Sequence, residues 1–364
     1  MKVRLGDLTQ IKTGKLDANA SSPDGEYPFF TCSKDPLRIS SYSYDCECVL
    51  VAGNGDLNVK YYQGKFDAYQ RTYIIEGNGD GRLYIPYLYY FLLGYVEELR
   101  RLSIGGVIKY IKLGNLTEAM IKLPSVQLQM EIVDLLERAT GLLEARHEQL
   151  HTLDTLIKAR FVELFGDVIN NTMGWPHFVF SDIASSRLGK MLDAKQQSGK
   201  HQFPYLANFN VQWFRFALNN MNKMDFDEDD QAEFELKEGD LIVCEGGEIG
   251  RCAIWHNEIQ PCYFQKALHR VRCNTDTVIP EYLARWFQFN CEHGGFAAIE
   301  GAKATIAHLP GAKLKALQVA VPPLDLQKSF AAFVSQVDKS KVVVQEALDK
   351  AQLLFDSLMQ QYFG

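Results

Sequence analysis

The sequence lacks the features that mark membrane-spanning, secreted and zinc-binding proteins. No run approaches the about 18 consecutive apolar residues of a bilayer-spanning helix, and the opening segment MKVRLGDLTQ is too polar for a signal peptide. Eight cysteines are present, but none stands in a CxxC pair, and the nearest to one is Cys46 with Cys48. This spacing is typical of reduced thiols in a cytoplasm rather than of a disulfide framework or a zinc site. We therefore expect a cytoplasmic protein without a membrane partner.

Motifs of nucleotide-dependent enzymes are also missing. The Gly-Lys pairs are followed by Leu16, Phe66, Met191 and His201 instead of Ser or Thr, which excludes a Walker A loop. The segment GNGDLN (53–58) is an incomplete GxGxxG and is more typical of a hairpin or a ligand-contact loop than of a cofactor-binding turn. The histidines form no HExxH pair. We expect no catalytic residue, metal or cofactor, and an enzyme with an unrecognised site is the weakest interpretation.

The composition is that of a folded globular protein. The chain has 364 residues, of which 47% are hydrophobic and 23% charged, enough for two to three domains. The net charge of −7 does not exclude a nucleic-acid partner, because only the charge on the contacting face matters. The acidic run DFDEDDQAEFE (225–235) predicts a solvated loop. The alternative is a face that meets a basic partner and keeps DNA off that side.

An internal repeat organises the chain. The segments LFG (164–166) and YFG (362–364) match at an offset of 198 residues, which also aligns Leu128-Gln129 with Leu326-Gln327. Further matches follow in the same order with a smaller offset: CVLVAGNGD (48–56) with DLIVCEGGE (240–248), Ile85-Pro86 with Ile279-Pro280, and Gly14-Lys15 with Gly189-Lys190. The ordered series predicts two copies of a globular domain followed by a helix.

Two stretches, 130–165 and 328–363, carry apolar residues at seven-residue steps and contain no proline. Each predicts a helix about 54 Å long that packs against a partner helix; the alternative is that each packs only on its own domain. We expect the two helices to lie antiparallel as a coiled coil, with the domains at opposite ends and related by a pseudo-twofold axis. The predicted helix-pair interface comprises Leu136, Leu143, Leu150, Ile157, Leu164, Val337, Val344, Leu348, Phe355 and Leu358.

The globular parts are predicted to be mixed α/β. The runs VLVAG and LIVCEG are β-branched and end in glycine-rich turns, and 263–273 alternates like a strand near its end. Residues 85–102 and 280–291 are amphipathic and predict helices. The predicted organisation is a domain over 1–125, a long helix within 126–167, a second domain over 168–323 and a second long helix within 324–364.

Several motifs occur in a fixed order: RLGDLTQIKTGK (4–15), GWPHFVFSDI (174–183) after FGD, and VPPLDLQ (321–327) before the second long helix. With these motifs and its two-copy layout, the chain resembles a specificity subunit of a type I restriction–modification system over its full length. The resemblance implies two target-recognition domains, each reading one half of a bipartite, asymmetric sequence in double-stranded DNA. The paired helices would set the spacer between the halves.

The resemblance also implies partners and a division of labour. The helices would dock two adenine methyltransferase (modification) subunits, and motor–nuclease (restriction) subunits would join through them in a prokaryotic cytoplasm. The chain itself would have no active site, with S-adenosylmethionine and ATP bound by the partner subunits only. The competing interpretation is a free-standing two-headed DNA-binding regulator or adaptor without catalytic partners.

Candidate DNA contacts are basic and polar residues in or beside glycine- and polar-rich loops, since Lys and Arg hold phosphates and polar side chains read bases. In the first copy they are Lys12, Lys15, Ser33, Lys34, Arg38, Asn54, Lys60, Tyr61, Tyr62, Gln70, Arg71, Lys109 and Tyr110. In the second copy they are Arg187, Lys190, Asn208, Asn210, Gln212, Arg215, Arg251, Gln265, Lys266, Lys303 and His308. The pair Lys15 and Lys190, and the loops 53–60 and 245–251, are favoured because they recur in both copies.

Overall fold

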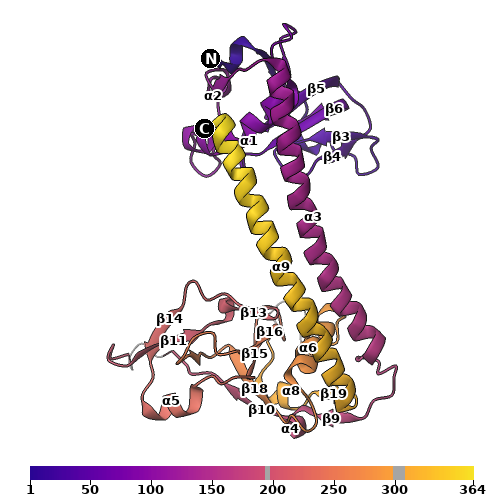
Figure 1. Cartoon of the computed structure of the whole chain (residues 1–364), viewed down its shortest axis with the longest axis vertical. Coiled ribbons are helices and arrows are strands. Elements are labelled where there is room, and N and C mark those ends of the chain that lie inside the picture. The colour runs from indigo at the N-terminus through magenta and orange to yellow at the C-terminus, as the bar shows by residue number, and fades with distance from the viewer. Residues whose placement is uncertain (193–196, 298–307) are drawn as a thin grey trace. The chain divides into compact units, whose positions relative to one another are not determined.

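A computed structural model describes residues 1–192, 197–297 and 308–364, and the chain divides into two compact units (Figure 1). Unit 1 consists of Met1–Gln149 with Val344–Gly364, and unit 2 of Leu150–Val343. Each unit contains a globular α/β part together with a portion of each of two long helices, α3 (Val126–Phe165) and α9 (Leu324–Phe363). The boundaries predicted for the four domains and helices stay predictions.

Unit 1 is built on a six-stranded sheet. In order across the sheet its strands are β2 (Thr9–Thr13), β7 (Thr72–Gly77), β5 (Tyr44–Ala52), β6 (Val59–Ala68), β3 (Tyr27–Phe30) and β4 (Leu37–Ile39). Neighbours are antiparallel except β3 and β6, which are parallel. The central strand β5 is apolar on both faces: Val49 and Val51 join the core under α1 (Ile85–Leu102), and Cys48 and Leu50 join a second core. Burial on both faces explains its continuous hydrophobic run.

The smaller elements of unit 1 surround this sheet. They are η1 (Leu5–Asp7), η2 (Ala18–Ala20), α2 (Leu113–Thr117) and the antiparallel pair β1 (Lys2–Arg4) with β8 (Met120–Lys122). The predicted helix over 85–102 is confirmed by α1, and the predicted hairpin at 53–58 is confirmed as the β5–β6 connection.

In the residues of unit 2 that the structure describes, two sheets have three or more strands. The first has the order β10 (Ala184–Leu188), β18 (Leu268–Cys273), β15 (Leu241–Cys244) and β16 (Cys252–Ile254); the second has the order β14 (Asn222–Asp225), β11 (Gln202–Leu206) and β17 (Tyr263–Phe264). Strand β15 repeats the pattern of β5, since Leu241 and Val243 face the core under α6 (Pro280–Glu292) whereas Ile242 and Cys244 face another core. The helix predicted over 280–291 and the strand predicted near the end of 263–273 are confirmed.

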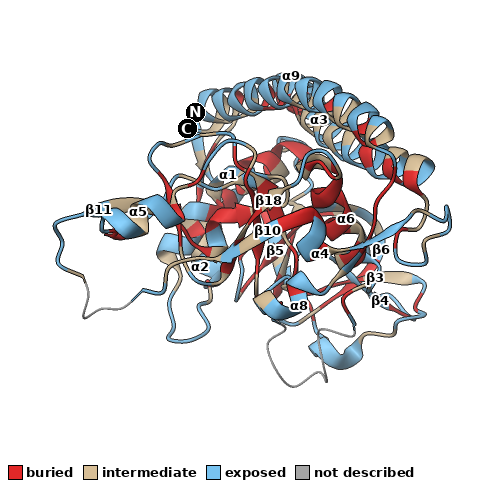
Figure 2. Cartoon of the chain, turned by 90° about the horizontal axis from the view of Figure 1, so that it is seen from below, coloured by how far each residue is buried: buried red, intermediate tan, exposed pale blue. Residues whose placement is uncertain are grey.

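The remaining elements of unit 2 are short. They are β9 (His177–Val179) paired with β19 (Gln318–Ala320), β12 (Val211–Gln212) paired with β13 (Arg215–Phe216), η4 (Asn208–Asn210), and the helices α4 (Phe180–Ile183), α5 (Glu228–Phe234) and α8 (Gly311–Lys315). Buried residues concentrate in the strands and in α1 and α6, whereas much of α3 and α9 is exposed (Figure 2).

Both long helices begin four residues before the predicted starts at 130 and 328. Helix α9 starts directly after Pro323, and α3 starts two residues after Pro124, since proline is favoured next to a helix start and has no N–H to leave unpaired. Helix α3 ends at Phe165, and Gly166 follows with a φ of +71°, a conformation that glycine adopts without strain. The predicted end of the first long helix at 165 is therefore confirmed.

Each unit joins three helices through one apolar core. In unit 1, Leu136 of α3 and Leu358 of α9 share a core with α1. In unit 2, Ile157 of α3 and Phe330 of α9 share a core with α6. Within each unit the two long helices therefore contribute to the same core, together with a domain helix. The alternative that each long helix packs only on its own domain is wrong, because α9 packs against α1 and α3 packs against α6.

The predicted helix-pair interface is buried unevenly. Leu136, Leu358 and the half-buried Phe355 lie in the unit 1 core. Ile157, Val337 and the half-buried Leu164 lie in the unit 2 core. Of the remaining residues, Leu348 is buried, and Leu143, Leu150 and Val344 are half-buried. Leu135, Leu142 and Leu156, beside this stripe, are exposed. The contacting stripe is therefore narrow.

A buried glutamine fixes the start of α3 in unit 1. The Gln129 side-chain oxygen accepts a hydrogen bond from the N–H of Tyr84 at 2.8 Å. Its amide donates to the carbonyl of Arg82 at 2.8 Å and to that of Pro124 at 3.0 Å. One fully buried side chain thus connects the long helix to Tyr84, the residue that precedes α1.

Gln327 makes the matching set of bonds in unit 2. It accepts from the N–H of Ile279 at 3.0 Å and donates to the carbonyls of Thr277 and Pro322 at 3.0 and 2.7 Å. Like Gln129, it is fully buried. The two copies are therefore alike down to single hydrogen bonds at this position.

The same bonds correct one alignment made from the sequence. Tyr84 corresponds to Ile279, and Tyr87 and Tyr282 each donate a hydroxyl bond to the strand before a long helix, at 2.9 and 2.5 Å. The match of Ile85-Pro86 with Ile279-Pro280 is therefore wrong by one residue. Proline is tolerated at either of the first two positions of a helix, since neither N–H has an intrahelical acceptor.

Candidate nucleic-acid interface

In unit 1, loops from distant parts of the sequence meet beyond β5. Gly53 donates its N–H to the carbonyl of Arg71 at 2.8 Å and accepts from the N–H of Ile111 at 2.9 Å. Gly55 donates to the carbonyl of Lys109 at 3.0 Å. The Asn58 amide reaches the carbonyl of Cys32 at 2.9 Å. Backbone and amide bonds thus fix the relative positions of four loops.

We call these segments, with the adjoining glycine turn, the unit 1 loop cluster: 14–16, 31–34, 53–60, 69–72 and 104–111. The cluster brings together the candidates Lys15, Ser33, Lys34, Asn54, Lys60, Gln70, Arg71, Lys109 and Tyr110. Most of these side chains are exposed. Loops on a rigid sheet are the usual place for residues that bind a ligand.

Lys60 is held more tightly than the other lysines of this cluster. Its ammonium donates to the carbonyl of Ser33 at 2.8 Å and to the side chain of Asn58. Burial lowers the pKa of Lys60, and the nearby Cys32 and Asp35 oppose this effect. These two hydrogen bonds therefore fix the position of the Lys60 ammonium within the cluster.

A second loop cluster, the unit 2 loop cluster, comprises 189–190, 207–210, 245–251, 264–268 and 308–309. The same pattern of hydrogen bonds holds its loops together, and we call this pattern the frame. Glu245 takes the place of Gly53: its N–H donates to the carbonyl of Ala267 at 2.9 Å, and its carbonyl accepts from the N–H of Leu309 at 2.6 Å. Isolated bridges pair Asn54 with Tyr110 in unit 1 and Gly246 with His308 in unit 2. The predicted alignment of 48–56 with 240–248 agrees with these bonds.

Arg251 replaces Asn58 in this frame. Its guanidinium donates to the carbonyl of Asn208 at 3.2 Å and to the Asn208 side-chain oxygen at 2.7 Å, as Asn58 does to Cys32. The unit 2 loop cluster thereby brings together the candidates Lys190, Asn208, Arg251, Gln265, Lys266 and His308. The candidate Lys303 lies outside the described residues.

The glycine turns of the two clusters correspond, but their lysines do not. A Cβ on Gly14 would lie 2.1 Å from the carbonyl oxygen of Ala68, and one on Gly189 would lie 2.3 Å from that of Gln265. Leu16, however, makes the backbone bonds in unit 1 that Lys190 makes in unit 2. The match of Lys15 with Lys190 is therefore wrong by one residue, because the first copy has one more residue after its glycine.

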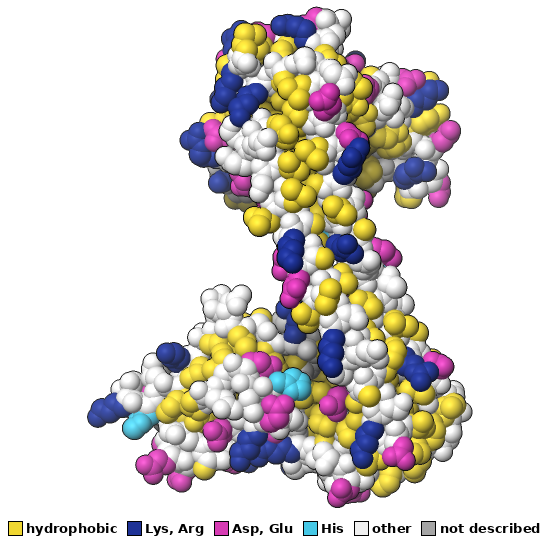
Figure 3. Space-filling model, viewed as in Figure 1, with side chains coloured by type: hydrophobic (Ala, Val, Ile, Leu, Met, Phe, Trp, Pro, Cys, Tyr) yellow, Lys and Arg dark blue, Asp and Glu magenta, His cyan; other side chains and the backbone are white. Residues whose placement is uncertain are grey.

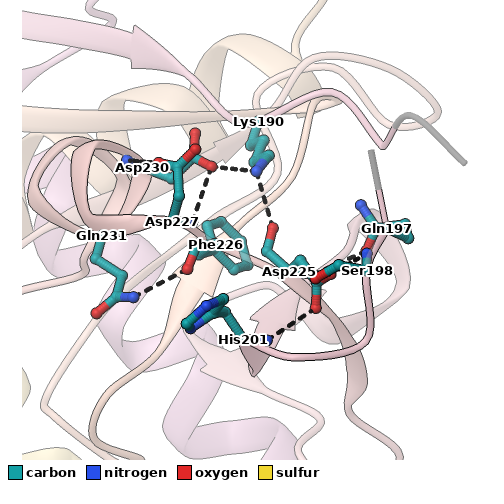
Figure 4. Close-up of polar contacts among 9 residues, drawn as sticks. All are labelled: Lys190, Gln197, Ser198, His201, Asp225, Phe226, Asp227, Asp230 and Gln231. Carbon is teal, nitrogen blue, oxygen red and sulfur yellow. Dashed lines mark hydrogen bonds and ion pairs between the residues drawn. The ribbon is translucent and has the colours of Figure 1, made fainter. Parts of the chain in front are cut away.

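This shift places the two lysines in different surroundings. Lys15 is exposed, whereas only 14% of the Lys190 side chain is exposed. The Lys190 ammonium forms an ion pair with Asp230, donates to the carbonyl of Asp225 at 2.8 Å and lies 5.2 Å from the ring centre of Phe226 (Figure 4). The DNA contact of Lys190 stays a prediction, but its charge is already paired within the unit.

The acidic run 225–235 is not the solvated loop that the sequence predicts. Asp225 accepts hydrogen bonds from the Ser198 hydroxyl and the Gly199 N–H at 2.8 and 2.7 Å (Figure 4). Asp227 caps α5 by accepting from the N–H of Asp230 at 2.8 Å. Burial opposes ionisation of Asp225, but these donors lower its pKa below the usual value. The run contains a capped helix, and the carboxylates of Asp225, Asp227 and Asp230 are bound within the unit, whereas Glu228 and Asp229 are exposed.

The remaining candidates are buried or lie elsewhere on the units. Asn210 belongs to the unit 2 loop cluster, but it is fully buried and binds the Ala207 N–H and the Ala217 carbonyl at 2.9 and 2.8 Å, so it shapes a turn and is not accessible to DNA. The other candidates in unit 1 are Lys12 (paired with Glu76), Arg38 (on β4), Tyr61 (bonded to Glu47) and Tyr62 (packed on Phe30). Those in unit 2 are Arg187 (paired with Glu233), Gln212 (bonded to Phe209) and the exposed Arg215. The clusters do not include them.

Sequence reasoning missed two features of the unit 1 loop cluster. Asn58 was not a candidate, although its place in GNGDLN is a signal for a loop-closing amide. The exposed aliphatic residues Ile104, Val107 and Ile108 were not predicted, because only basic and polar side chains were candidates for DNA contacts.

Within the ranges that the structure describes, no group of His, Cys, Asp and Glu could hold a metal ion, and no helix is long and apolar enough to cross a membrane. The eight cysteines are free thiols. Burial raises the pKa of Cys244 to about 11, which keeps this thiol protonated at neutral pH.

Two α/β parts that carry polar loop clusters held by matching hydrogen bonds define a protein with two recognition domains. The sequence matches the family of type I restriction modification DNA specificity domains over residues 1–153 and 173–350, and the chain belongs to this family. Its members supply DNA specificity and are not catalytic.

Individual relatives agree with this assignment. The chain is 39% identical over 156 residues to the specificity subunit of the EcoDI type I restriction enzyme of Escherichia coli, an alignment that covers 43% of the chain and 34% of that protein. It is 22% identical over 352 residues to a putative type I specificity subunit of Haemophilus influenzae, which covers 93% of the chain and 86% of that protein. The chain thus spans about a third of the EcoDI subunit.

Two solved structures share the fold. The S subunit of a type I restriction–modification system from M. genitalium aligns over 100% of this chain and 96% of its own length, with a TM-score of 0.63 and 16% identity. A chain from a structure that addresses complex assembly and conformational transition of the type I system aligns over 100% and 97%, with a TM-score of 0.60 and 14% identity.

Proposed function

We propose that the chain reads a bipartite, asymmetric DNA target, with one loop cluster on each half. The observation that carries this proposal is the occurrence of one hydrogen-bonded loop frame twice in one chain, with different side chains on it. Lysine and arginine side chains hold the phosphates, and Asn, Gln and Tyr side chains meet base edges. Unlike side chains on like frames give unlike half-sites.

The long helices set the distance between the two halves. Each has 40 residues and is therefore about 60 Å long. We propose that they form one antiparallel coiled coil with a domain at each end, related by a pseudo-twofold axis. Contacts within unit 2 support this direction, since Phe165 packs on Phe330 with ring centres 5.4 Å apart, whereas the earlier Asp154 pairs with the later Lys341 at 2.6 Å.

The exposed apolar side chains of the long helices form the docking faces for the partners. They are Leu135, Leu142, Leu353 and Leu354 in unit 1 and Leu156, Val162, Val342 and Val343 in unit 2. Hydrophobic side chains reach the surface along the helices on the face that Figure 3 shows. Exposed apolar groups of this kind are buried when a partner binds. The partners are two adenine methyltransferase subunits, which hold S-adenosylmethionine, and through them motor–nuclease subunits, which hold ATP.

Mapping methylated adenines in cells that express the chain with its methyltransferase tests the proposal. We expect one motif with two unlike halves and a gap of constant length between them. A contiguous motif, or methylation that does not depend on the chain, would contradict it.

A further inference from the structure

The loop between α1 and α2 exposes aliphatic side chains at its tip. Val107 is fully exposed and Ile108 is 62% exposed, and Ile104 beside them is 42% exposed. All three belong to the unit 1 loop cluster. Neighbouring β-branched apolar residues at the end of a loop are unfavourable in water and point to a surface that covers them in a complex.

The base of this loop is fixed, so the tip is held outward. Ile104 and Tyr110 exchange backbone hydrogen bonds of 3.0 and 2.9 Å, and Lys109 accepts one from Gly55 at 3.0 Å. Gly105 has a φ of +120°, and a Cβ there would lie 2.6 Å from the Ile108 carbonyl oxygen. Only glycine therefore allows the turn that brings the tip out.

The charge of the loop favours a polyanion. Residues 103–112, SIGGVIKYIK, contain two lysines and no carboxylate. The neighbouring Asn54, Lys109 and Tyr110 are themselves candidate DNA contacts. An apolar tip between basic and polar side chains fits duplex DNA, which offers phosphates at the sides and, where a base step opens, apolar base faces in the middle.

We propose that Val107 and Ile108 form an apolar wedge that enters the DNA half-site read by unit 1 and unstacks one base step. The inference rests on the proposed function and adds a mechanism to it. Apolar side chains between base pairs kink a duplex at a cost that further contacts offset. Because an adenine must leave the stack before it is methylated, a wedge at a neighbouring step lowers the cost of that movement.

The first test is a salt titration of DNA binding by the complex of chain and methyltransferase, on a duplex that carries the mapped target. The variant V107T/I108T is compared with V107L/I108L, which keeps the apolar character at the same exposed positions. We expect the threonine pair to weaken binding about tenfold, and the leucine pair to bind like the unchanged chain. The slope of log K against log salt should stay the same in both, since no phosphate contact is lost.

The second test replaces each adenine of the half-site by 2-aminopurine in turn, on either strand, leaving out the adenine that is methylated, because that base leaves the stack without a wedge. The unchanged complex should raise the emission at one base step, and V107T/I108T should abolish that rise. Equal affinity and equal emission in the threonine pair would overturn the wedge, as would a loss of methyltransferase assembly in that pair, which would assign the tip to a protein interface. If the unchanged complex fails to prefer the target over a scrambled duplex, the proposed function fails instead.

Discussion

Units 1 and 2 use different residues for the same bond. In unit 1 the hydroxyl of Tyr73 donates to the carbonyl of Ile111 at 3.2 Å. In unit 2 His269 makes the equivalent contact with the carbonyl of Leu309 at 2.9 Å. The position of the donor is kept while its chemistry changes, which shows that the frame depends on where a hydrogen bond is made and not on which side chain makes it.

A one-residue difference in length separates the two clusters further. It leaves Lys15 on the surface of unit 1 and puts Lys190 into an internal ion pair in unit 2. The hydrogen bonds of the frame are therefore kept even when a one-residue difference in length changes a lysine from exposed to largely buried. The proposed function requires such tolerance, because it assigns a different half-site to each copy of the domain.

The largest expected loss of stability comes from removing the buried glutamine, the feature that the two units share most closely. Gln129→Leu and Gln327→Leu each leave one buried N–H and two carbonyls without their partner, so we expect each to cost about 4 kcal/mol of stability. Denaturant unfolding followed by hydrogen exchange should show the loss in the unit that carries the change. An effect below about 1 kcal/mol in either would mean that water replaces the bonds.

A smaller loss is expected at the glycine turns. Gly14→Ala and Gly189→Ala each place a methyl group against backbone oxygen, which we expect to cost about 3 kcal/mol. The matched control is Gly141→Ala in α3, where a Cβ meets none of the described atoms within 4 Å and a gain of about 1 kcal/mol is expected. Thermal unfolding measures all three, and equal losses in the three variants would refute the assignment of the turns.

Lysine substitutions should separate the two units. Lys190→Ala leaves Asp230 without its ion-pair partner at a largely buried site, so we expect a stability loss of about 2 kcal/mol and little change in salt dependence of DNA binding. Lys15→Ala should leave stability unchanged and flatten the slope of log K against log salt by about 1. A flattened salt slope with unchanged stability in Lys190→Ala would instead show that Lys190 contacts a phosphate.

The smallest expected effect is a pH dependence confined to unit 2. Burial lowers the pKa of His269, and the Leu309 carbonyl only partly opposes this, so the folded unit holds the imidazole neutral. The unfolded chain binds a proton below its pKa of about 6.5, and stability is therefore lost as the pH falls through that value. Between pH 7.5 and 5.5 we expect a loss of about 1 kcal/mol.

His269→Gln should remove this dependence, because the amide does not titrate. Hydrogen exchange in β18 of unit 2 and β7 of unit 1 reports the two units separately. Tyr73 stays neutral throughout this range, since burial raises its pKa, so a matching loss in unit 1 would assign the effect to other groups.

Much of the fold was predictable from periodicity. Seven-residue spacing predicts both long helices, and the aligned Leu-Gln pairs mark positions where the structure makes identical hydrogen bonds. The errors of one residue at Pro86 and Lys190 arose because matching letters do not reveal an inserted residue, whereas backbone hydrogen bonds do.

The loop clusters were only partly predictable. Residues of 14–16, 31–34 and 104–111 meet through tertiary contacts that no local pattern encodes. Polarity alone put the buried Asn210 among the candidates and left Val107 out, because it does not distinguish a side chain that supports a loop from one that is presented by it.

The central claim is that each loop cluster reads one half of the target, and methylated-adenine maps of two paired variants test it most directly. One variant is Gln70→Ala with Arg71→Ala in unit 1, and the other is Gln265→Ala with Lys266→Ala at the matching turn of unit 2. We predict that each relaxes the bases of one half, a different half in each case, with the gap unchanged. Relaxation of the same half by both variants, or of both halves by either one, would contradict the account.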